Sequence, residues 1–318
     1  MMMPSFFREY WDFRLSDIFG DDTEVPITDE SLSWLEMPSR EFLRYAEGRP
    51  RFSFDWVPED PATFQNSPTL LLAQAHRFWL TLRAIDRFLP AQPGSTVLDL
   101  GGFPFTIDIG IRDYLERDSQ ILTTYNLPPA ADWTEALVPR RIEVIPVNLD
   151  PLVRPTTPIA GMTDHLPMPD ASVDFIVFAH VIEHLYHPLD ILSESVRVLK
   201  PGGRLLLTTD NGFLLGGLLN YLDAGKHLHE PVEGTAAMVF SEWRGHVRFY
   251  TEGDLTTLLE RVGLVVMRTS LYEVLYNSVP EHYFVNPFLQ MPRWRAELLT
   301  RFPVYRNEVM IIAEKSAL

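Results

Sequence analysis

The chain has 318 residues, of which 46% are hydrophobic and 12% aromatic, and its formal net charge is −16. This composition provides for a large core and excludes an intrinsically disordered chain. The acidic balance lacks the basic surface of a nucleic-acid-binding protein and the polybasic clusters that hold proteins on anionic membranes. We therefore expect no nucleic-acid partner.

The sequence contains no cysteine. Disulfides, thiolate metal sites and cysteine nucleophiles are thereby excluded, and a reducing compartment is favoured. The first residues lack the basic and apolar regions of a signal peptide. The most apolar stretch, 205–222, is interrupted by polar residues and makes a poor membrane span. We expect a cytoplasmic protein without membrane insertion.

The first 67 residues are irregular and rich in aromatic residues and prolines. We interpret residues 1–67 as an N-terminal helical extension that packs on a larger domain and could form a lid over a substrate site. The larger domain would comprise residues 68–318. It begins with apolar residues at helical spacing, which predict a helix over 68–89 that ends before Pro90.

Short apolar segments and helical patterns then alternate along the chain. Two further helices are predicted over Leu189–Leu199 and Asp254–Val262. Seven strands are predicted, over 96–100, 121–127, 141–149, 172–180, 203–209, 264–274 and 308–315. Strands that are apolar on both faces and alternate with helices predict an α/β fold with a doubly wound, mostly parallel seven-stranded sheet. Residues 280–306, which contain several prolines and aromatics, would be an insertion before the last strand.

Ligands of such sheets bind beyond the carboxyl ends of the strands, near the topological switch point. The first predicted strand ends there in Asp99-Leu-Gly101-Gly102. Glycine permits close approach of the backbone to a ligand because no Cβ intervenes, and a helix N-terminus after the loop would offer free N–H groups. On its own this pattern is equally typical of an ordinary strand-to-helix turn.

A second, more specific pattern covers residues 162–209. It contains an acid-x-Leu-Pro segment, followed by a strand that begins at Val173-Asp174. A turn with the sequence Glu183-His184-Leu185 comes next, and then a helix that ends in Arg-Val-Leu-Lys-Pro-Gly-Gly. This stretch resembles the class I S-adenosylmethionine-dependent methyltransferases, in particular their small-molecule, ubiquinone-biosynthesis-like branch. Residues 246–264 are similar to a late segment of the same family. The resemblance spans residues 68–318 without the insertion, and it implies a Rossmann-like methyltransferase fold and S-adenosyl-L-methionine as cofactor.

The resemblance also implies roles for individual residues. The residues implied to bind the cofactor are Asp99, Gly101 and Gly102 at the methionine part, Asn126 at the ribose, Asp164, His165 and Leu166 at the adenine, and His180 between cofactor and substrate.

Two features depart from the family pattern. Phe103 and Phe105 stand where the family's loop has its second and third glycines, so their side chains must point away from the cofactor or crowd it. Asn126 replaces a carboxylate, which weakens the expected hydrogen bonds to the ribose. These departures leave open an alternative, a catalytically silent binding protein that kept the methyltransferase fold.

The sequence His180-Val-Ile-Glu183-His184 also fits the H-x-x-E-H pattern of a zinc protease, which leaves a metal-dependent hydrolase as a further alternative. That pattern needs one continuous helix, whereas this segment emerges directly from a strand. Pro188 also disfavours a helical conformation at His187. The methyltransferase resemblance explains the segment without a metal, so we expect none. A magnesium-assisted methyl transfer that involves Glu183, Asp210 or Asp223 stays open as an alternative, although nothing in the spacing demands it.

Methyl transfer to a hydroxyl benefits from a base with a pKa near neutrality, which favours histidine. The candidate catalytic residues are His184, His180 and His246, with His184 ranked first because it lies beyond the fourth strand. His227 and His229 are further candidates, and Tyr250 and Asp210 are weaker ones. We expect methyl transfer to a small-molecule acceptor, most readily to an oxygen of a metabolite, sugar or lipid-like substrate.

Overall fold

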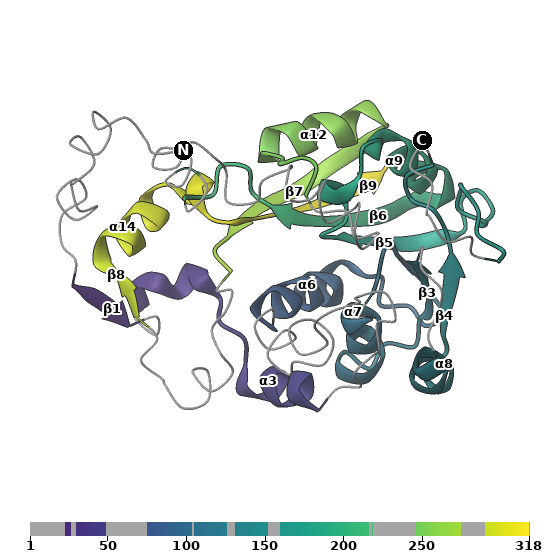
Figure 1. The fold of residues 1–318 in the computed structure, drawn as a ribbon, viewed down its shortest axis with the longest axis horizontal. Coiled ribbons are helices and arrows are strands. Elements are labelled where there is room, and N and C mark those ends of the chain that lie inside the picture. Colours follow the sequence, from purple (N-terminus) through teal and green to yellow (C-terminus); the bar gives the residue numbers. More distant parts are fainter. Residues whose placement is uncertain are drawn as a thin grey trace, which may run out of the picture.

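The protein is described from a computed structural model (Figure 1). The structure describes residues 23–26, 30–48, 75–103, 105–125, 131–151, 160–215, 218, 246–274 and 290–317. Among the helices of these residues, none is long and apolar enough to cross a membrane.

A seven-stranded sheet forms the centre of the molecule (Figure 1). Its strand order is β4-β3-β2-β5-β6-β9-β7. The strands are β2 (Thr96–Asp99), β3 (Gln120–Tyr125), β4 (Ile142–Pro146), β5 (Val173–Ala179), β6 (Leu199–Asp210), β7 (Leu264–Tyr272) and β9 (Glu308–Lys315). All pairings are parallel except those of β9, which runs antiparallel to β6 and β7. The predicted doubly wound, mostly parallel sheet is confirmed.

Helices cover both faces of this sheet (Figure 1). One layer contains α6 (Ala75–Phe88), α7 (Thr106–Ile109), which continues into the π-helix η2 (Gly110–Tyr114), and α8 (Ala131–Leu137), followed by η3 (Val138–Arg140). The other layer contains α9 (Pro188–Val198) and α12 (Glu252–Arg261). Successive side chains of β5 point alternately to the two faces of the sheet, as expected for a strand. Phe175 and Val177 belong to the core under α6, whereas Ile176 and Phe178 belong to the core under α9 and α12.

The helix boundaries have local causes. Pro188 occupies the first turn of α9, where a missing N–H costs nothing. Thr251 caps α12 in a reciprocal capping box with Asp254. Strand β6 begins at Leu199, four residues earlier than predicted, and a register shift between Val173 and Phe175 accommodates the extra length. The start of the helix predicted from residue 68 lies outside the described residues.

The N-terminal region and the insertion before β9 pack against each other. Strand β1 (Glu24–Pro26) pairs antiparallel with β8 (Gln290–Pro292), so two segments far apart in the sequence lie side by side (Figure 1). A separate apolar cluster joins η1 (Glu30–Leu35), α14 (Arg293–Arg301) and Leu215. Helix η5 (Pro303–Tyr305) follows, and α3 (Arg40–Glu47) packs on α6. The boundary between residues 1–67 and 68–318, and a lid role of the extension, stay predictions.

Candidate active site

The loop after β2 lies at the switch point between β2 and β5, where the winding of the sheet reverses. Gly101 has a φ of +73°, and a Cβ there would be 2.8 Å from Val181 Cγ2. Its N–H donates to Thr124 Oγ1 at 2.8 Å. A Cβ on Gly102 would be 2.1 Å from Thr123 Oγ1. Only glycine fits at these two positions, because one needs a left-handed conformation and the other a bare α-carbon.

A small, partly open cavity of about 80 Å³ adjoins this loop. Its lining includes Arg77, Phe78, Thr81, Asp99, Gly101, Gly102, Phe103, Thr106, Ile107, Ala179 and His180. Four of the residues predicted to contact the cofactor thus share one cavity. Sequence reasoning missed Arg77, because it lies on α6, upstream of every motif.

Asp99 is the most unusual group of this cavity. Its side chain is buried, and its Oδ2 has no hydrogen-bond partner. Burial raises the pKa of Asp99 to about 7. An unpaired carboxylate in a buried place costs free energy unless a ligand satisfies it. The cavity is therefore suited to a ligand that carries a positive charge or a hydrogen-bond donor.

The two phenylalanines of the loop have different positions. Phe105 is fully buried and packs edge-to-face on Trp133, with the ring centroids 4.9 Å apart. It points away from the cavity, although its φ of +60° is unusual for a bulky residue. Phe103 stacks on Tyr125 at 5.2 Å and forms part of the cavity wall. Neither side chain fills the space beside Gly101 and Gly102.

The segment that we expect at the adenine lies beyond β4, two strands away from β2. Asn148 Nδ2 donates to Asp164 Oδ1 at 3.3 Å, and Val147 pairs with Thr163. His165 is exposed, whereas the side chain of Leu166 is buried in the core. These residues are not among the described residues that line the cavity. Asn126 lies outside the described residues, as do His227 and His229.

A second cluster of charged groups lies where β5 and β6 end and β9 begins. His180 follows β5 with a φ of +54°. Its Nδ1 lies 3.2 Å from Glu183 Oε1, and its Nε2 lies 3.0 Å from Glu308 Oε2. Burial and Arg77 oppose protonation of His180, but the two carboxylates outweigh them and raise its pKa to about 9. Burial in turn raises the pKa of Glu308 to about 7. Since a protonated imidazole cannot accept a proton, this environment argues against His180 as the general base.

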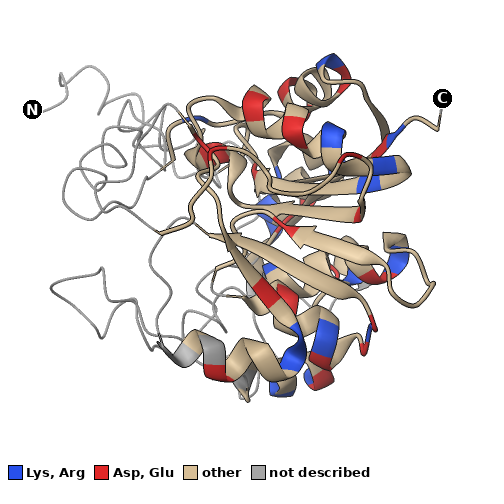
Figure 2. Ribbon diagram, turned by 90° about the vertical axis from the view of Figure 1, so that its right-hand side faces the viewer, with Lys and Arg blue, Asp and Glu red and all other residues tan. Residues whose placement is uncertain are grey.

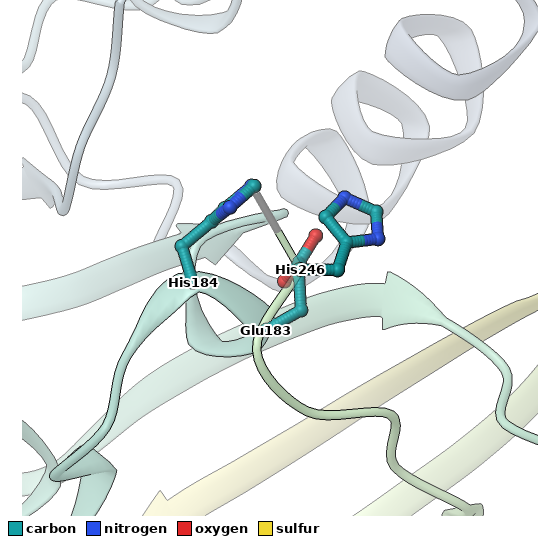
Figure 3. A group of neighbouring side chains, drawn as sticks. All are labelled: Glu183, His184 and His246. Carbon is teal, nitrogen blue, oxygen red and sulfur yellow. The ribbon is translucent and has the colours of Figure 1, made fainter. Parts of the chain in front are cut away.

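Glu183 and two histidines form the neighbouring part of this cluster (Figure 3). Glu183 is buried, and Thr209 Oγ1 donates to its Oε2 at 2.9 Å. Burial would raise the pKa of Glu183, but the hydrogen bond from His180 and the nearby histidine charges hold it well below its usual range. The rings of His184 and His246 meet edge-to-face with centroids 4.8 Å apart. The structure thus brings all three predicted catalytic histidines to one end of the sheet.

The protease pattern does not form its helix. Only Ile182–His184 makes a short 3-10 turn, η4, and His180 precedes it in a left-handed conformation. His180 and His184 therefore do not share one helix face, as an H-x-x-E-H metal site requires.

Comparison with known proteins agrees with the fold. A family model described as "Methyltransferase domain" matches residues 107–269. This match covers half of the chain, so the chain belongs to the methyltransferase domain family. The region that the family model matches contains the sequence pattern of residues 162–209 and the cluster of Glu183, His184 and His246.

Individual relatives cover smaller parts. A probable S-adenosylmethionine-dependent methyltransferase of Mycolicibacterium smegmatis is 36% identical over 34% of this chain and 35% of its own length. The ubiquinone/menaquinone biosynthesis C-methyltransferase UbiE of Pseudomonas fluorescens is 27% identical over 51% of this chain and 64% of its own. The chain thus spans only part of the curated relatives that it matches. Among solved structures, an S-adenosylmethionine-dependent methyltransferase from Mesorhizobium loti is 17% identical with a TM-score of 0.47, covering 76% of this chain and 98% of its own.

Proposed function

We propose that the chain binds S-adenosyl-L-methionine and transfers its methyl group to an oxygen of a small-molecule acceptor. The observation that carries this proposal is the buried Asp99 carboxylate, whose Oδ2 lacks a hydrogen-bond partner beside the Gly101–Gly102 turn. Family membership and the names of the relatives, several of which are called S-adenosylmethionine-dependent, point to the same cofactor.

The residues of the cavity fit this cofactor. Its amino acid part carries an ammonium and a carboxylate, and the cavity offers a carboxylate in Asp99 and a guanidinium in Arg77. The bare α-carbon of Gly102 leaves room for close approach. Phe103, which stacks on the buried Tyr125, provides aromatic surface at one wall. Asp164 at the adenine and Asn126 at the ribose remain part of the proposal.

When bound, the cofactor supplies an electrophilic methyl group on a sulfonium sulfur. The contribution of this chain would be to position the acceptor and to exclude water, which can provide much of the rate. His180, held between Glu183 and Glu308, would fix the wall between cofactor and acceptor. His184 and His246 are the remaining candidates to take up the proton of a hydroxyl acceptor.

A small acceptor agrees with the charge distribution. Both basic and acidic residues occur on the described helices (Figure 2), and the chain as a whole carries −16. Such a surface offers little attraction to a polyanion. A location in the cytoplasm remains an expectation based on the absence of cysteine.

The proposal is tested by incubating the protein with S-adenosylmethionine labelled in the methyl group and a panel of sugars, phenols and lipid-like alcohols. We expect release of S-adenosylhomocysteine and label in at least one acceptor. Binding of the cofactor without transfer to any acceptor of the panel would favour the silent binding protein instead. With an accepted substrate, His184→Ala should slow turnover more than it weakens cofactor binding.

A further inference from the structure

Glu183, His184 and His246 form a compact set of metal-ligand types (Figure 3). Each offers one ligand atom, and the three atoms lie within 4.8 Å of one another. The carboxylate is buried, whereas both histidines are partly exposed. The set therefore combines a fixed negative charge with two imidazoles that solvent or a ligand can reach.

Backbone contacts hold the two segments of this set together. The N–H groups of Val247 and Arg248 both donate to the carbonyl oxygen of Glu183, at 2.9 and 3.3 Å. His246 is thereby fixed beside η4, although more than sixty residues separate it from Glu183 in the sequence. The arrangement does not depend on flexible side chains alone, which is what a site of defined geometry requires.

Neighbouring polar groups orient the ligand atoms. Glu183 Oε2 accepts the hydrogen bond from Thr209, and His246 Nδ1 lies 3.4 Å from Asp210 Oδ2. Metal-bound histidines usually direct their second ring nitrogen to such a carboxylate. Asp210 would thus orient the His246 ring through Nδ1, with Nε2 as the coordinating atom.

We infer that Glu183, His184 and His246 bind a divalent transition-metal ion, with zinc as the best match. Two histidines and one glutamate are a ligand set of catalytic zinc, which keeps a further position open. Imidazole ligands favour zinc and its neighbours over magnesium and calcium. This inference replaces the expectation from sequence that no metal is bound, and it uses His246 in place of the His180 of the protease pattern.

The second group of ligand types nearby, His180, Asp210 and Glu308, is less suited. Both ring nitrogens of His180 already face carboxylates, at 3.2 and 3.0 Å. No ring nitrogen is left for an ion without breaking one of these contacts.

The proposed ion would lie beside the cavity, because Glu183 contacts His180 and His180 lines the cavity wall. Its open position could bind the acceptor oxygen and lower the pKa of the hydroxyl. The hydroxyl proton would pass to solvent, an oxygen lone pair would form the bond to the methyl carbon, and the electron pair of the broken carbon–sulfur bond would stay on sulfur. This role rests on the proposed function, whereas metal binding does not.

The test measures Zn²⁺ binding to the full chain, without an affinity tag and after treatment with a chelator, by calorimetry and elemental analysis. We expect about one tightly bound ion per chain. His184→Gln and His246→Gln should each lower the affinity by at least about tenfold. His187→Gln is the matched control, since His187 lies on the same segment but contacts Asp150 at 2.9 Å. Thermal unfolding of each variant shows whether it is folded.

Absence of Zn²⁺ binding to the folded wild type, or equal binding by the wild type and both cluster variants, would overturn the inference. Titration of the same samples with S-adenosylhomocysteine separates it from the proposed function. Zinc binding without S-adenosylhomocysteine binding would retain the metal site and overturn methyl transfer. The reverse result would overturn the metal site and leave His184 as a candidate base.

Discussion

Gly102 lies directly against Thr123: a Cβ on the glycine would be 2.1 Å from the threonine hydroxyl oxygen and 2.9 Å from Asp99 Oδ2. The loop after β2 therefore rests on β3 with no space for a side chain. In Gly102→Ala, the loop must shift, which removes the close approach proposed for the cofactor. We expect at least tenfold weaker S-adenosylhomocysteine binding and a loss of about 1–3 kcal/mol of stability from overpacking.

Gly253→Ala is the matched control for this prediction. The Cβ added in α12 would have only Thr251 Oγ1, at 3.8 Å, as a neighbour. Alanine at a helical position should stabilise by a few tenths to about 1 kcal/mol and leave ligand binding unchanged. Equal ligand binding by Gly102→Ala and Gly253→Ala would remove the loop from the cofactor site.

Asp99 should make stability depend on pH in an unusual direction. Burial raises the pKa of Asp99 from 3.8 to about 7, so between these values the folded state binds the proton that the unfolded state has released. The contribution of Asp99 to stability is therefore lost as pH rises from about 4 to 7. Urea unfolding at pH 5 and pH 8 gives the free energy of unfolding of Asp99→Asn and of the wild type. The difference, variant minus wild type, should be larger at pH 8 than at pH 5.

The same variant should bind S-adenosylmethionine more weakly at pH 8, because a neutral amide replaces the carboxylate that would face the cofactor's ammonium. Unchanged affinity in Asp99→Asn at pH 8 would contradict the role proposed for this side chain.

Phe105 combines buried packing with a left-handed backbone, a conformation that costs about 1–2 kcal/mol in residues other than glycine. Phe105→Ala should lower the free energy of unfolding by about 3–5 kcal/mol, because it leaves a cavity beside Trp133 and keeps the strained backbone. Phe105→Gly relieves that strain and should be no less stable than Phe105→Ala. At Phe175, in the buried strand β5, glycine should instead be clearly worse than alanine. Chemical unfolding of the four variants makes the comparison.

His76 ties α6 to the N-terminal region. Its Nε2 lies 2.9 Å from the carbonyl oxygen of Leu35 and 3.2 Å from that of Glu36, so the neutral imidazole donates there. Burial lowers the pKa of His76 to about 4, and the unfolded state binds more protons between pH 6.5 and 4. Its contribution to stability is thus lost as pH falls through this range.

His76→Gln should reduce the loss of stability between pH 7 and pH 5 relative to the wild type, in urea unfolding at both values. An unchanged difference between the two pH values would mean that His76 is not neutral in the folded state.

Most of the fold could be predicted from the sequence, because the patterns that indicate its strands and helices are local. Strand β5 could be predicted from its apolar run and α12 from Thr251 and its spacing. The glycine loop and the three histidines were also identified, and the structure brings them to the carboxyl ends of the central strands. The direction of Phe105 was not predictable, since it depends on Trp133 in a helix that follows the next strand.

Other parts of the site depend on long-range pairing. Glu308 faces His180 only because β9 inserts antiparallel beside β6, which sets Glu308 opposite Asp210. No local pattern distinguishes Glu308 from an ordinary glutamate at the start of a strand. Arg77 reaches the cavity from a helix whose sequence shows only core periodicity.

Cofactor binding beside Asp99 and Gly102 is the central requirement of the proposed function. The decisive measurement is calorimetric titration of the purified wild type with S-adenosylhomocysteine and, separately, with S-adenosylmethionine. We predict micromolar binding of about one molecule per chain for both. No binding to protein that unfolds cooperatively would contradict the account, and the cavity at the end of β2 would then need a different ligand.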